Sequence, residues 1–163
     1  MINDWMTRIR RSATVEQWAL LPLRLLVGFG FAAHGYAKLA RGTDNFAAIL
    51  AAMKIPAPDA MAWVTALLEL LGGASILLGA YVALLSVPLA AVMVTAMFGV
   101  HLRYGFSSIR LKALSEAGAE FGPVGYELNL FYIAALLVLA LSGPGVLSFD
   151  RRRAAKRKHQ AGR

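Results

Sequence analysis

Six ionisable side chains lie within or at the ends of strongly apolar stretches of the sequence. They are Arg24, His34, Lys38, Glu69, His101 and Glu127. An Arg or Lys at the centre of a membrane-spanning helix costs at least about 2.5–3.5 kcal/mol, so such groups usually face a bundle interior or a wet cavity. Imidazoles, ammonium groups and carboxylates in a low dielectric neutralise one another and exchange protons. These residue types therefore predict proton transfer or the binding of a small polar head group.

The first apolar segment must position three of these residues. Residues 20–39, LLPLRLLVGFGFAAHGYAKL, are long enough to cross a bilayer, because about 20 apolar residues cover the ~30 Å hydrocarbon core. At about 100° per residue, Arg24, His34 and Lys38 fall within one sector of about 80°. One face of this helix is therefore polar, and another part of the chain must supply its partner.

The composition predicts an integral membrane protein. Hydrophobic residues make up 58% of the 163-residue chain and the mean hydropathy is +0.59, whereas soluble domains average about 45–50% apolar residues. The chain has no cysteine, which excludes disulfides, cysteine-ligated metals and clusters, and thiol nucleophiles.

Four apolar segments predict four membrane-spanning helices. They cover residues 19–40, 60–79, 82–102 and 126–142. We expect Asp59 to cap the second helix and Pro88 to kink the third, with a long loop at 103–125. The prediction is an all-α fold: an integral membrane four-helix bundle with a short interfacial helix between spans one and two.

The interfacial helix is predicted from periodicity. Residues 44–53 carry Phe46, Ile49, Leu50 and Met53 at i, i+3, i+4 and i+7, which is the spacing of an amphipathic helix lying on a membrane surface.

The charge distribution predicts the orientation. The formal net charge is +8, and ten of the 17 Lys and Arg residues lie in the two tails. An even number of spans places both tails on one side, and the positive-inside rule makes that side the cytoplasm. We therefore divide the chain into a basic cytoplasmic segment (1–18), a four-span membrane domain (19–150) and a basic cytoplasmic tail (151–163). We expect the basic tails to contact anionic lipids, and we expect no nucleic-acid partner.

This topology gathers five ionisable groups in the outer half of the bundle and leaves Arg24 alone in the inner half. The five are His34, Lys38, Glu69, His101 and Glu127. Structural explanations stay open: Lys38 snorkelling outward, His34 satisfied in the core, or Glu69 in a salt bridge with Arg24 or Lys38. No metal is expected, because the ligands lack tight local spacing and Lys38 would repel a cation.

An ordered set of short motifs resembles the DoxX family of small bacterial membrane proteins. The matching residues are Arg24-Leu25, Gly28, His34-Gly35, Lys38-Leu39, Pro56, Pro58, Glu69-Leu70-Leu71-Gly72-Gly73, Gly79, His101, Gly105-Phe106, Gly125-Tyr126-Glu127-Leu128, Gly143-Pro144-Gly145, Ser148 and Asp150. The resemblance covers about residues 20–150 and implies a four-span bundle in the bacterial inner membrane.

The resemblance also carries expectations about function. The family's name comes from a membrane subunit linked to quinone reduction during thiosulfate oxidation, and other members are associated with redox-stress complexes or with metal- and peptide-maturation operons. The loop at 107–120, the basic tail and the lack of cysteine depart from the expected pattern. Thiol-based sulfur chemistry would therefore need another subunit.

The leading hypothesis is a membrane subunit of a quinone-linked redox system. Glu69 and His34 are the candidate catalytic residues, and Arg24, Lys38, His101 and Glu127 are the candidate substrate-binding residues. His34, Lys38 and His101 would hydrogen-bond the oxygens of a quinone, and Glu69 and Glu127 would relay protons. Electrons would come from a protein partner in a redox complex.

Two alternatives stay open. One is a binding or transport module for a small anion or other polar solute, which would act as a homo-oligomer. The other is a non-catalytic assembly subunit, in which the buried charges fix the helix register.

Overall fold

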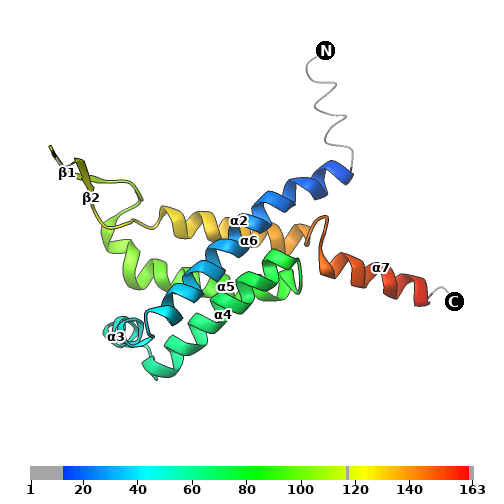
Figure 1. Cartoon of the computed structure of the whole chain (residues 1–163), viewed down its shortest axis with the longest axis horizontal. Helices are drawn as coiled ribbons and strands as arrows, with labels where there is room; N and C mark the ends of the chain where they lie inside the picture. The colour runs from blue at the N-terminus through cyan, green and yellow to red at the C-terminus, as the bar shows by residue number, and fades with distance from the viewer. Residues whose placement is uncertain (1–12, 117, 162–163) are drawn as a thin grey trace, which may run out of the picture.

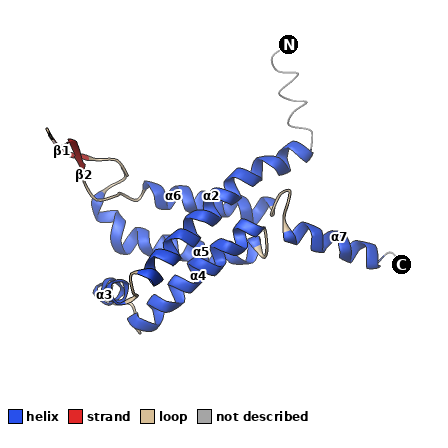
Figure 2. Ribbon diagram, viewed as in Figure 1, coloured by secondary structure: helices blue, strands red, loops and turns tan. Residues whose placement is uncertain are grey.

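The computed structural model describes residues 13–116 and 118–161. The helices are α2 (Ala13–Ala40), α3 (Asp44–Ala52), α4 (Pro58–Leu78), α5 (Val82–Ala96), the π-helix η1 (Met97–His101), the 3-10 helix η2 (Leu102–Tyr104), α6 (Glu127–Ser142) and α7 (Phe149–Ala161). Strands β1 (Leu111–Ser115) and β2 (Gly118–Phe121) form an antiparallel hairpin between η2 and α6 (Figures 1 and 2).

Three helical segments of the described chain are long and apolar enough to cross a membrane. They are Val15–Ala40, Pro58–Leu78 and Val82–Tyr104. The fourth predicted span, α6, has only 16 residues, which extend about 24 Å at 1.5 Å per residue and fall short of the hydrocarbon core. The mainly helical fold and three of the four predicted spanning helices are therefore confirmed by length and composition.

The long helices run antiparallel in chain order. α2 packs mainly on α4, and α5 packs mainly on α6. Figure 1 shows that the start of α2 and the whole of α7 lie at one end of the molecule, whereas α3 and the hairpin lie at the other. We call these the tail end and the α3 end.

Glycines allow α2 and α4 to approach closely. A Cβ atom on Gly35 would lie 2.6 Å from the Ala66 carbonyl oxygen, and one on Gly73 would lie 2.7 Å from the Gly28 carbonyl oxygen. Because a real Cβ never comes so near to backbone, only glycine permits this crossing. Small residues have this role at many helix interfaces in membranes.

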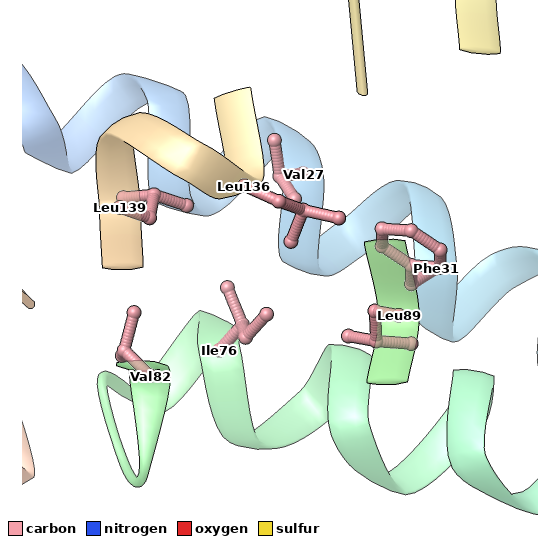
Figure 3. Packing of buried hydrophobic residues seen from close by; sticks show 7 residues of the cluster. All are labelled: Val27, Phe31, Ile76, Val82, Leu89, Leu136 and Leu139. Carbon is pink, nitrogen blue, oxygen red and sulfur yellow. The ribbon is translucent and has the colours of Figure 1, made fainter. Parts of the chain in front are cut away.

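Buried residues recur at alternating steps of three and four in each long helix, as in coiled coils. In α4 they include Ala62, Ala66, Glu69, Gly73 and Ile76. The apolar cluster that joins the four helices consists of Val27, Phe31, Ile76, Val82, Leu89, Leu136 and Leu139 (Figure 3).

The structure corrects four details of the sequence-based fold. The fold is not entirely α-helical, because the 103–125 loop contains the hairpin. Asp59 does not cap α4, since that helix begins at Pro58 after Ala57, whose φ is 48°. The third span changes from α to π geometry after Ala96, and most of the predicted basic tail is the helix α7.

The predicted interfacial helix is confirmed as a helix, because α3 spans Asp44–Ala52. Residues 1–12 of the predicted cytoplasmic segment lie outside the described residues, and α2 already begins at Ala13. The division of the chain at residues 18 and 150 stays a prediction.

Candidate functional site

A cavity of about 660 Å³ lies among the helices toward the α3 end. Apolar side chains from α3, α4, α5 and α6, such as Leu50, Met61, Val92 and Leu128, form most of its wall. Eight side chains with polar groups interrupt this apolar surface. They are His34, Lys38, Thr65, Glu69, Thr95, His101, Asn129 and Tyr132.

The structure brings four of the six predicted site residues to this one cavity: His34 and Lys38 from α2, Glu69 from α4, and His101 at the end of η1. Their convergence follows from the antiparallel helix order and from the close α2–α4 crossing described above. The role of each in binding or catalysis stays a prediction.

Lys38 and Glu69 form an ion pair in the wall of the cavity, with Lys38 Nζ donating a hydrogen bond to Glu69 Oε2. Glu69 is 2% exposed, and the Lys38 ammonium also lies 4.9 Å from the centre of the Phe46 ring. Gly35, one turn before Lys38, and Ala66, one turn before Glu69, keep the two helices close. The pair therefore presents a nearly neutral dipole to the cavity.

His101 is oriented by the chain segment that leads into α6. Its Nδ1 donates a hydrogen bond to the Val124 carbonyl oxygen over 3.0 Å. In a neutral imidazole with the proton on Nδ1, Nε2 is an acceptor. Because Nδ1 is already engaged, Nε2 is the ring nitrogen that can serve a ligand in the cavity. His34 is an exposed residue of α2 on the cavity wall.

Two polar residues of α6 that line the cavity, Asn129 and Tyr132, were not predicted from the sequence. Asn129 is 5% exposed and its Nδ2 donates to the Met93 carbonyl oxygen over 3.3 Å, on the turn of α5 just before the π-helix. Tyr132 lies on the same helix face one turn later, with its ring edge-to-face with Phe31 at 5.2 Å. An asparagine inside the apolar run 126–142 was a signal that the sequence offered.

Arg24 does not line the cavity. It is 1% exposed and donates hydrogen bonds to the carbonyl oxygens of Pro144, Val146 and Leu147. These carbonyls belong to the turn between α6 and α7, where no helix supplies their partners. Arg24, predicted to bind substrate, therefore holds this turn against α2 at the tail end.

Glu127 also lies outside the cavity lining. Its Oε2 accepts a hydrogen bond from the Ser108 backbone N–H over 2.9 Å, and its own N–H donates to the Phe106 carbonyl oxygen. At the first residue of α6, the side chain therefore fixes the incoming loop. The predicted constellation of five groups is therefore reduced to four.

A comparison with protein-family models finds DoxX over residues 19–102. This stretch is just over half of the chain and contains all four cavity residues that the sequence predicted. The chain belongs to the DoxX family. No curated protein and no solved structure matches it. With its apolar helices, it is a DoxX-family membrane protein, and α6 with Asn129 and Tyr132 lies beyond the matched segment.

Proposed function

We propose that this DoxX-family protein is the membrane subunit of a quinone-linked redox system and that its cavity binds the quinone head group. The observation that carries the proposal is the cavity itself: an apolar chamber of about 660 Å³ with a few polar groups converging on it. Such a lining is typical of small-molecule sites. A quinone combines a flat apolar ring with two oxygens that accept hydrogen bonds, which fits this lining.

Two groups are suited to the quinone oxygens. His101 Nε2 accepts a hydrogen bond from a hydroxyl of the reduced, quinol form, because its Nδ1–H is held by Val124. His34, which lines the cavity from α2, serves the second oxygen. Phe31, Met93 and Tyr132 pack against the ring.

The Lys38–Glu69 pair supplies the proton-exchange group. Oxidation of a quinol releases two protons and two electrons, and reduction of a quinone takes up the same number. Glu69 exchanges one proton and His34 the other, and a partner protein exchanges the electrons. In this assignment Glu69 and His34 are catalytic residues and Lys38 and His101 are binding residues.

The same pair disfavours the anion-binding alternative. An anion site needs net positive charge, but the Lys38 ammonium is neutralised by Glu69. Most of the remaining wall is apolar, so a small polar solute would lose its water and gain few hydrogen-bond partners in return.

The proposal includes the membrane topology. In this topology α6 completes a fourth crossing with local thinning of the bilayer, because it is shorter than the hydrocarbon core. Both tails are cytoplasmic, and the cavity lies in the outer half of a bacterial inner membrane. The common location of α7 and the start of α2 supports this arrangement, as do the ten basic residues of the tails.

The direct test is a titration of the purified protein in nanodiscs with a short-chain quinone. Ala96→Phe places a ring in the cavity, which Ala96 lines, and should abolish saturable binding. Ala134→Phe adds the same ring at an exposed position of α6 away from the cavity and should bind like the wild type. Absence of saturable binding in the wild type, alone and with its co-purifying partners, would contradict the proposal and favour an assembly subunit.

A further inference from the structure

A second groove is lined by residues of α7 and of the start of α5, and α7 lies at the tail end of the molecule (Figure 1). Its volume is about 530 Å³. The residues that line it are Tyr81, Ala83, Leu84, Asp150, Arg153, Ala154 and Arg157. We propose that this groove binds the phosphate of an anionic phospholipid. The site is independent of the cavity at the α3 end.

Asp150 fixes α7 relative to α5. Its two carboxylate oxygens accept hydrogen bonds from the N–H groups of Tyr81 (2.9 Å) and Val82 (3.0 Å), and its own N–H donates to the Gly79 carbonyl oxygen. The carboxylate therefore satisfies the N-terminus of α5, where backbone N–H groups and the helix dipole offset its negative charge. These three hydrogen bonds fix the position of α7 beside the start of α5, and with it the shape of the groove.

Two guanidinium groups lie on the groove side of α7. Arg153 Nη1 donates to the Tyr81 hydroxyl over 3.0 Å, and its guanidinium lies 5.8 Å from the centre of that ring. Arg157 follows one turn later. Among the described residues, the ion pairs include neither arginine. Because a guanidinium presents a planar fork of donors that matches phosphate oxygens, the pair is suited to a phosphate.

The apolar side of the groove identifies the phosphate as that of a lipid. Leu84 lines the groove, and Val87 follows one turn later on α5. Each is 69% exposed, and both belong to the first two turns of the spanning segment Val82–Tyr104. Tyr81 stands at the end of this segment, where aromatic residues mark the membrane interface. Acyl chains beside Leu84 and Val87 would place a phosphate beside Arg153 and Arg157. A soluble phosphate would make no use of the apolar surface.

Native mass spectrometry of the full chain tests this site. The protein is released from nanodiscs that contain equal amounts of phosphatidylglycerol and phosphatidylcholine, and the retained lipids are counted. We expect selective retention of phosphatidylglycerol by the wild type. In high salt, Arg153→Gln with Arg157→Gln should lower its retention about thirtyfold, because each guanidinium loses a direct charge-assisted contact with the phosphate that contributes about fivefold.

The matched control is Arg151→Gln with Arg152→Gln, which removes two exposed charges of α7 that do not line the groove. In high salt, which screens diffuse attraction, this variant should retain phosphatidylglycerol within about threefold of the wild type. Equal losses in the two variants, equal retention of both lipids, or displacement of phosphatidylglycerol by inorganic phosphate would overturn the proposal. If the double variant does not fold, Arg157→Gln alone should still give about a fivefold loss.

Discussion

At the scale of single residues, the charged side chains of this protein divide into two groups. Lys38 and Glu69 neutralise each other inside the cavity, whereas Arg24 and Glu127 stabilise backbone turns elsewhere. The sequence left the partner of Glu69 open between Arg24 and Lys38, and the structure pairs it with Lys38. The residue types could not predict the second group, because the partners of Arg24 and Glu127 are backbone atoms, which no residue type identifies.

The buried ion pair predicts an asymmetric cost of mutation. Lys38→Met leaves the Glu69 carboxylate, 3% exposed at the side chain, without its cation, and we expect a loss of about 3–5 kcal/mol in unfolding free energy. Glu69→Leu should cost less, about 1–2 kcal/mol, because the Lys38 side chain is 21% exposed and can snorkel. The double variant should recover to within about 1 kcal/mol of the wild type. Detergent-induced unfolding provides the measurement, and strictly additive losses would show that the pair is not coupled.

Substitution of Arg24 should lower the stability of the protein without weakening quinone binding. Arg24→Met removes three hydrogen bonds to carbonyl oxygens and should lower the unfolding free energy by about 3 kcal/mol or more. Arg24→Lys should restore little, since an ammonium lacks the guanidinium fork. Quinone affinity, titrated on the folded fraction, should stay unchanged. If a variant lost quinone affinity while its unfolding free energy stayed normal, Arg24 would contribute directly to quinone binding.

At the scale of elements, the cavity depends on how α2 and α4 cross. Gly28, Gly35 and Gly73 bring the two backbones together, and this contact holds Lys38 opposite Glu69. Helical periodicity predicted α3 and the spanning helices closely, because burial of one face sets a repeat that the sequence displays. The hairpin was missed because β1 and β2 are short and fully exposed, so no burial pattern marks them.

Two adjacent glycines of α4 provide a matched test of the crossing. A Cβ on Gly73 would lie 2.7 Å from the Gly28 carbonyl oxygen, whereas one on Gly72 would lie 3.4 Å from a flexible Leu89 methyl group. Gly73→Ala should therefore lower the melting temperature clearly, at a cost of about 2–3 kcal/mol. Gly72→Ala should stay within about 1 kcal/mol of the wild type, because alanine's better helix propensity offsets the contact. Equal effects at the two positions would contradict the close α2–α4 packing.

At the scale of the whole molecule, the antiparallel helix order places α7 and the start of α2 at one end and the cavity toward the other. The sequence predicted this order from the number of apolar segments and their short connections. It could not predict where Arg24 and Asp150 attach the turn and α7 to the tail end, because these contacts join residues about 70 to 120 positions apart. The role of Asn129 was also not predicted, because this side chain carries no charge and its neighbours in α6 are almost all apolar.

The absence of natural cysteine allows single engineered cysteines to report the topology. We expect Ser115→Cys, in the hairpin, to react with an impermeant maleimide added outside intact inner-membrane spheroplasts. Arg152→Cys, in α7, should react only after the membrane is permeabilised, because the proposed topology places α7 on the cytoplasmic side. Reaction of both positions from the same side would mean that α6 does not cross the membrane.

The proposed function requires a quinone head group to occupy the cavity beside Lys38 and Glu69. The most direct test is photolabelling. A photoreactive quinone is irradiated with the protein in native membranes, and the labelled peptides are then identified. The account predicts adducts within 31–38, 61–69 and 92–101, the cavity-lining stretches of α2, α4 and α5–η1, and their suppression by excess unlabelled quinone. Adducts confined to lipid-facing residues such as Leu84 and Leu141, with no competition, would contradict it.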